Sequence, residues 1–278
     1  MKVLVRRACN GVWQRCRRAE REIPFVSEPV EHQDQVRPPG GGGRQPAINA
    51  PKVVLVLFAL MVAVRGYQSL VTREGEGWLL LRFALIPARY DSSNGLIYPG
   101  GWAADIWVFV THMFLHGDWL HLAINGFFML AFGSVLARRF GTMKFLLFSL
   151  LSGLGAAGVH LWAYWGDQAP LIGASGAISG QMAGTVRLMF ARRVSVFEAH
   201  RQGADQMRAL SLLEVFTNPR ALTFLAIWVA VTIFAGAGGI MAPAGASIAW
   251  EAHLGGFAAG ILIFGLFDQR PTRQNVLS

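Results

Sequence analysis

A serine and a histidine stand in two short motifs of small residues, each within an apolar stretch of the chain. Ser175 belongs to Gly173-Ala174-Ser175-Gly176, and His253 belongs to Ala252-His253-Leu254-Gly255-Gly256. A serine hydroxyl is a weak nucleophile until a neighbouring base accepts its proton, and histidine is the usual base. Together the motifs predict that Ser175 is a nucleophile and that His253 is its general base.

The same motifs also have a structural interpretation, because glycines at helical spacing let two helices pack closely. Ser175 alone is then a small interface residue, and His253 alone is a hydrogen-bonding residue within a span. The presence of both in one chain favours the catalytic interpretation. The glycines expected to pack helices beside the site are Gly173, Gly176, Gly256 and Gly260.

A third polar group precedes these motifs. His121 and Asn125 are four residues apart, so they lie on one face of a helix. Both side chains can donate hydrogen bonds to a negatively charged oxygen, which is the task of an oxyanion hole. The alternative is a polar pair that bonds one helix to another.

His112 and His116 have the same four-residue spacing, which also suits a zinc site. The segment contains no His-Glu-x-x-His pattern, no cysteine and no obvious carboxylate ligand. We therefore predict neither a metal site nor a cofactor.

The composition is that of a membrane protein. Of the 278 residues, 53% are hydrophobic and 15% are charged, and the mean hydropathy is +0.40. Soluble domains carry about 25% charged residues. The apolar runs are long and do not alternate, which favours a bundle of membrane helices over a barrel. The predicted fold class is an all-α polytopic membrane protein.

We predict six membrane-spanning helices, over residues 50–67, 119–136, 143–165, 171–191, 221–238 and 249–267. His121 and Asn125 then lie near the outer end of the second span. Ser175 lies at the start of the fourth span, and His253 lies in the sixth.

The net charge of +9 comes from basic residues beside the apolar runs, and no basic motif typical of nucleic-acid binding occurs. Basic residues follow the second, fourth and sixth spans and also precede the first. Six spans put all of these segments on one side, so both termini are predicted to be cytoplasmic. A bacterial inner membrane is the default location.

The connection over residues 68–118 is rich in Trp, Phe and Leu and is interrupted by Pro87, Pro99, Gly100 and Gly101. It fits either a half-inserted interfacial loop or an ordinary extracytoplasmic loop. The polar residues 1–48 contain a Pro- and Gly-rich stretch typical of a flexible linker, and Cys9 and Cys16 in this segment do not indicate a disulfide framework.

The predicted domain organisation has three parts. Residues 1–48 form a disordered cytoplasmic tail, residues 49–268 form the membrane domain, and residues 269–278 form a short cytoplasmic tail.

In this chain order, the three polar groups resemble the rhomboid family of intramembrane serine proteases. The resemblance extends over residues 50–268. It rests on His116 with His121-x-x-x-Asn125, on Gly173-Ala174-Ser175-Gly176, and on Ala252-His253-Leu254-Gly255-Gly256 with Gly260.

The resemblance implies a six-helix bundle with an interfacial first loop and a water-filled cavity open to the outer face. It implies a Ser175–His253 dyad, with His121, Asn125 and the backbone N–H of Ser175 stabilising the oxyanion. The implied substrates are transmembrane proteins in a lipid bilayer, cleaved without a cofactor.

Two positions depart from the family pattern. Some rhomboids carry a tyrosine four residues after the nucleophile, where it stacks on the base, but here that residue is Ser179. An arginine often follows a tryptophan in the first loop, but here Val108 follows Trp107. Another group must then orient His253, and the arginine anchor of the loop is missing or moved.

Two other functions fit parts of the sequence. An inactive rhomboid relative would bind membrane proteins without cutting them, but such relatives lack the serine or the histidine. A transporter would have inverted repeats and helices broken at the midplane. No convincing internal repeat occurs here, although the glycines of the fourth span mimic a broken helix.

Overall fold

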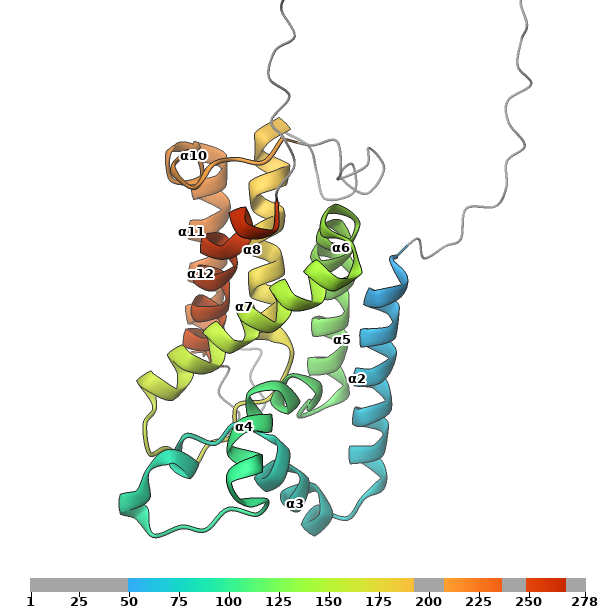
Figure 1. The fold of residues 1–278 in the computed structure, drawn as a ribbon, viewed down its shortest axis with the longest axis vertical. Coiled ribbons are helices and arrows are strands. Elements are labelled where there is room, and N and C mark those ends of the chain that lie inside the picture. Colours follow the sequence, from blue (N-terminus) through green and yellow to red (C-terminus); the bar gives the residue numbers. More distant parts are fainter. Residues whose placement is uncertain (1–49, 193–207, 237–248, 269–278) are drawn as a thin grey trace, which may run out of the picture. The chain divides into compact units, whose positions relative to one another are not determined.

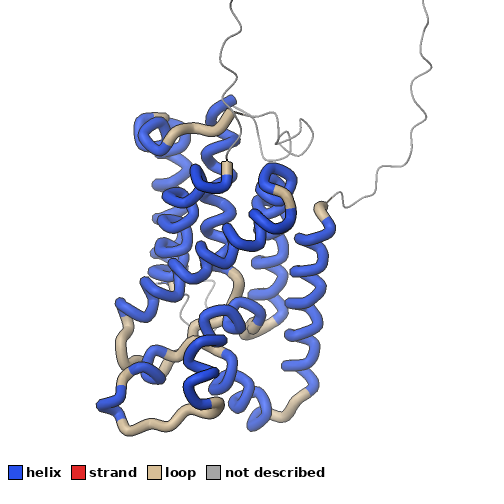
Figure 2. The backbone as a smooth tube through the Cα atoms, in the orientation of Figure 1, coloured by secondary structure: helices blue, strands red, loops and turns tan. Residues whose placement is uncertain are grey.

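The computed structural model describes residues 50–192, 208–236 and 249–268. Helices joined by loops make up these residues, as Figures 1 and 2 show, and β-pairing within them is confined to an isolated bridge between Leu85 and Leu171. The predicted terminal tails at 1–48 and 269–278 lie outside the described residues. The prediction of an all-α membrane protein is confirmed.

Five helices in the described ranges are long and apolar enough to cross a membrane. Four of them are α2 (Lys52–Leu70), α7 (Thr142–Ala163), α11 (Pro219–Gly236) and α12 (Trp250–Phe267). The fifth is one continuous helix that consists of α5 (Trp119–Phe128), a π-helical turn (Met129–Gly133) and α6 (Ser134–Phe140). They match five of the six predicted spans to within four residues at each end.

The fourth predicted span corresponds to α8 (Ser175–Arg192), which starts four residues later than expected. This helix is not among the five apolar ones. Residues 176–189 are all buried, against α7, α12 and the π-helical turn. A helix that is enclosed by other helices needs no lipid-compatible surface, so it tolerates glycine, serine and glutamine. The count of six spans stays a prediction.

The bundle has an inner and an outer part. Helices α7, α8 and α12 pack on one another, whereas only 17% of the residues of the apolar α2 window and 11% of those of α11 are buried. Figure 1 shows α2 on one side of these inner helices and α11 on the other. The outer pair therefore presents apolar side chains suited to lipid.

The long connection after α2 folds into short helical pieces. These are α3 (Arg73–Phe83), two 3₁₀ turns (Pro87–Tyr90 and Ser92–Asn94), α4 (Gly101–Thr111) and a 3₁₀ turn (His112–Phe114). Trp78, Trp102 and Ile106 are exposed on this segment. Exposed aromatic and aliphatic side chains suit the membrane interface, where we predict that the loop lies.

Two arginines anchor this loop in place of the one missing after Trp107. The Arg82 guanidinium lies over the Trp107 ring, 5.5 Å from its centroid, and Trp107 Nε1 donates to the Arg82 carbonyl at 2.9 Å. The Arg89 side chain is 2% exposed and pairs with Asp105 at 3.2 Å. It also donates to the carbonyl of Pro99. The loop therefore has arginine contacts at Arg82 and Arg89, although no arginine follows Trp107.

Candidate active site

Ser175 is the first residue of α8. The first helical hydrogen bond runs from the Ile178 N–H to the Ala174 carbonyl, at 2.9 Å. The N–H groups of the first turn have no acceptor within a helix, and the positive end of the helix dipole lies there. Ser175 is half-buried between buried neighbours. Backbone donors beside a hydroxyl group are the arrangement that acyl transfer needs.

Gly173 brings His121 and Asn125 to this helix start. Its φ of +105° is a conformation that residues with a β-carbon rarely adopt, and its N–H donates to the His112 carbonyl at 2.9 Å. A β-carbon on Gly173 would lie 2.8 Å from His121 Nε2 and 3.8 Å from Asn125 Nδ2. His121 and Asn125, which lie on α5, therefore contact the turn that leads into Ser175.

The start of α5 holds His121 in place. The Asp118 carboxylate accepts a hydrogen bond from the His121 N–H at 2.7 Å, as an N-cap does. The His116 ring packs edge-on against the His121 ring, with 5.1 Å between centroids. Burial, followed by the proximity of His121, lowers the pKa of His116 to about 4. His116 is thus a neutral neighbour of His121 at neutral pH.

His253 lies on α12, which contacts α8 through glycines. A β-carbon on Gly256 would overlap the backbone carbonyl of Gly176, and one on Gly260 would lie 2.5 Å from the Gly180 Cα. The helices therefore meet backbone to backbone. Ser175 precedes one contact residue and His253 lies three residues before another, so the two side chains belong to adjoining helix segments.

No hydrogen bond joins Ser175 to His253 within the part of the chain that the structure describes. Catalytic hydrogen bonds are often long in the absence of substrate. Ser179 is buried, with 6% of its surface exposed. No aromatic ring contact to His253 occurs among the described residues. The imidazole therefore lacks the stacking partner that some rhomboids have.

The structure also reveals a polar pair that our sequence interpretation missed. His160 Nδ1 on α7 and Glu251 Oε1 on α12 are 2.6 Å apart and buried. Both residues are ionisable groups inside predicted spans, and Glu251 is two residues before His253. Their position inside predicted spans could have identified them from the sequence, because ionisable residues in membrane helices are usually functional.

The histidines considered for zinc have other partners. His112 is buried, and its Nδ1 lies 2.8 Å from the Val108 carbonyl. His116 Nδ1 lies 3.2 Å from the Phe114 carbonyl. Within the described ranges, no group of three or more His, Cys, Asp or Glu side chains has the spacing of a metal site.

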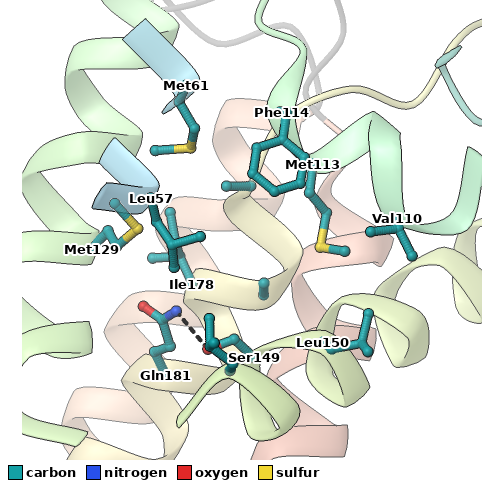
Figure 3. Close-up of a pocket in the computed structure, with 13 residues that line it drawn as sticks. Leu57, Met61, Val110, Met113, Phe114, Met129, Ser149, Leu150, Ile178 and Gln181 are labelled. Carbon is teal, nitrogen blue, oxygen red and sulfur yellow. Dashed lines mark hydrogen bonds between the residues drawn. The ribbon is translucent and has the colours of Figure 1, made fainter. Parts of the chain in front are cut away.

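A cavity of about 250 Å³ lies beside the first turns of α8 (Figure 3). Residues of α2, α4, α7, α8 and the turns at Met113 and Met129 line it, none of them acidic or basic. Its polar lining residues are Ser149 and Gln181, and Gln181 Nε2 donates to Ser149 Oγ at 3.0 Å. The lining positions 174, 177, 178 and 181 lie on a face of α8 other than that of Gly176 and Gly180, so the cavity is separate from the α8–α12 contact.

Three known proteins have similar sequences. The rhomboid protease AarA of Providencia stuartii is 30% identical over 158 residues, which cover 50% of this chain and 52% of the relative. The chloroplastic rhomboid-like protein 11 of Arabidopsis thaliana is 39% identical over 75 residues, 27% of this chain and 26% of the relative. The mitochondrial RHOMBOID-like protein 6 of Arabidopsis thaliana is 38% identical over 76 residues, which cover 27% of this chain and 24% of the relative. This chain thus matches about half, or less, of the length of these relatives.

A family model described as the Rhomboid domain matches residues 103–269, which is more than half of the chain. The matched range includes all three polar groups and every helix from α5 to α12. Together with the apolar helices, it identifies an integral membrane protein. The chain belongs to the rhomboid family.

Proposed function

We propose that the protein is an intramembrane serine endopeptidase that cuts peptide bonds in or near transmembrane segments of other membrane proteins. Ser175 is the nucleophile and His253 is the general base. The observation that carries the proposal is the glycine-to-glycine contact of α8 with α12, because it gives the helices of these two residues a common surface.

In the proposed first step, a substrate segment unwinds near the outer face and exposes a carbonyl group. The Ser175 hydroxyl attacks that carbonyl while the His253 imidazole accepts its proton. His253 then protonates the leaving amine, and a water activated by His253 hydrolyses the acyl-enzyme. The imidazole must enter the cycle in its neutral form.

The negative charge that develops on the substrate oxygen needs donors. We assign this role to the Ser175 N–H at the helix start, His121 and Asn125. In support, both side chains lie against the Gly173 turn, two residues before the nucleophile. A fixed donor acts most strongly where water is excluded, so donors held by a rigid turn suit this task.

Purified protein in detergent should cleave a model transmembrane substrate, whereas S175A and H253A should be inactive although folded. A fluorophosphonate probe should label Ser175 in the wild type. Equal cleavage by all three proteins would exclude Ser175 as the nucleophile. Failure of the wild type to cleave several substrates or to react with the probe would favour a membrane-protein-binding role without catalysis.

We further propose a bacterial inner membrane as the location, with both termini cytoplasmic and residues 49–268 as the membrane domain. In support, basic residues lie in the last turn of α6 and in the segments that follow α8 and α12. In a C9S/C16S background, a cysteine placed after Ser278 should react with a membrane-impermeant maleimide only in permeabilised cells. Labelling in intact cells would reverse the topology.

A further inference from the structure

A buried acid–base pair joins the end of α7 to the start of α12, the helix that carries His253. The side chains of His160 and Glu251 are 9% and 7% exposed, and their bonded atoms are 2.6 Å apart. His160 lies in the last turn of α7, and Glu251 lies in the first turn of α12. The catalytic mechanism proposed above uses neither residue.

The helix ends suit the charges of this pair. The C-terminal end of a helix favours a cation and the N-terminal end favours an anion, which are the positions of His160 and Glu251. The Tyr164 ring lies against the His160 ring in a tilted arrangement, with 5.2 Å between centroids. The aromatic ring therefore covers one side of the pair.

The remaining polar atoms of the pair are also enclosed. His160 Nε2 and Glu251 Oε2 are both buried without a hydrogen-bond partner among the described residues. Loss of either side chain would remove the hydrogen bond of a buried polar group, which is unfavourable. The His160–Glu251 bond therefore ties α7 to α12 at this point.

Different faces of α12 meet α7 and α8. Gly255, one turn after Glu251, packs on α7, where a β-carbon would lie 2.7 Å from the Val159 Cβ. Gly256, three residues after His253, packs on α8. Two residues along a helix correspond to a rotation of about 200°, so Glu251 and His253 point to nearly opposite sides. A restraint on Glu251 therefore sets the direction of His253.

The glycine contacts set how closely α12 approaches α7 and α8. A hydrogen bond is directional, and its strength falls steeply when its geometry is disturbed. The His160–Glu251 bond adds this directional restraint at the turn of α12 that contains His253. It acts where no aromatic ring contacts His253 among the described residues.

We infer that His160 and Glu251 are positioning residues whose bond fixes the rotation of α12 about its axis and holds the His253 imidazole toward Ser175. The inference rests on the proposed function, since it takes His253 to be the base. The two residues act through the helix and not on the reacting atoms.

Kinetic measurements on single variants test this role. E251A and H160A should lower kcat and the rate constant for fluorophosphonate labelling of Ser175 by about 10-fold or more, with KM changed less than about threefold. E251Q should keep most of both rates, because its amide oxygen can still accept from His160. A loss in E251Q as large as in E251A would assign the effect to charge and overturn the positioning role.

The matched control is D268A at the other end of α12. Asp268 forms a part-buried pair with Arg139, with N–O distances of 2.8 and 2.9 Å, so truncating it also destabilises this helix. D268A should lower the melting temperature but keep the labelling rate. If D268A and E251A lower the labelling rate equally, the effect is general destabilisation and the inference is wrong.

A second measurement does not require activity. In a C9S/C16S background, S175C/H253C should form a disulfide on mild oxidation, and adding E251A should slow this cross-linking several-fold. If E251A leaves the cross-linking rate unchanged, the inference is wrong. This outcome can be read even if the protein proves to be inactive. An inactive wild type whose cross-linking depends on Glu251 would refute the proposed function but support the positioning role. If E251A fails to fold, the labelling and cross-linking rates of H160A and E251Q are compared instead.

Discussion

Gly256 of α12 lies so close to the backbone carbonyl of Gly176 in α8 that no β-carbon fits between the two helices. The contact repeats one turn further along both helices. Helices that meet through glycine backbones can bring side chains on adjoining turns within reach of one another. This contact underlies the proposed pairing of Ser175 with His253.

G256A should abolish cleavage and lower the melting temperature. The added methyl group meets backbone atoms, which cannot rotate aside, so α12 must move away from α8. Overpacking costs about 1–3 kcal/mol, and a displacement of about 1 Å can lower a rate about 100-fold. Cleavage rate and thermal unfolding in detergent measure both effects.

The control for this change is G265A on the same helix, where no atom lies within 4 Å of the added carbon. Its activity should match the wild type, and its stability should be equal or higher because alanine favours helix more than glycine does. A fully active G256A would contradict the close helix contact.

G173A should reduce cleavage sharply even if the protein folds. Alanine resists the φ of +105°, and its methyl group would displace His121, whose Nε2 would lie only 2.8 Å from the added carbon. The matched control is G141A, because Gly141 also has a positive φ, +76°, but no atom within 4 Å. G141A should lose stability and keep kcat. Equal activity losses in both variants would assign the effect to backbone strain alone.

H121A and N125A should each lower kcat by about 10²–10³-fold with little change in KM, because an oxyanion donor acts mainly in the transition state. N125D is a stricter test, since it keeps the shape of the side chain and replaces the donor with an acceptor. Steady-state kinetics on one transmembrane substrate compare the variants. Wild-type kcat in N125D would remove Asn125 from the oxyanion hole.

The short helix α10 (Leu212–Thr217) should lose protection at low pH. Glu214 accepts hydrogen bonds from the Ser211 backbone and from Arg208, which lower its pKa from 4.5 to about 2. Because the folded pKa is depressed, this stabilisation is complete above about pH 4.5 and is lost as the pH falls toward 2. Protection factors of the α10 amides, corrected for the intrinsic exchange rate at each pH, measure it, and those of E214Q should show no such pH dependence. Protection factors that do not change with pH in the wild type would contradict the capping role.

Much of this architecture could be predicted from local properties of the chain. Hydropathy located five spans, because a run of about 20 apolar residues has few stable alternatives in a bilayer. Hydropathy located the helix α8 less well, since an enclosed helix with Gln181 and Arg187 on it is not uniformly apolar. Ser175 and His253 stood out because polar groups between glycines in apolar runs are rare.

The contacts between these elements could not be predicted in the same way. Trp107 lacks the expected arginine beside it in sequence, yet Arg82, which is 25 residues away, supplies one in space. The bond between His160 and Glu251 joins residues that are 91 positions apart. No spacing rule relates such positions, because loop length and helix rotation together decide which side chains meet.

By itself, the sequence determined the class of the protein, the places of most spans and the residue types available for chemistry, because apolar length and helical periodicity are local. Only the tertiary structure decided which faces of α7, α8 and α12 meet. The tertiary structure also brought His121 and Asn125 of α5 to the Gly173 turn and gave Glu251 a partner. The physical reason is that close packing selects among helix rotations that hydropathy alone leaves equivalent.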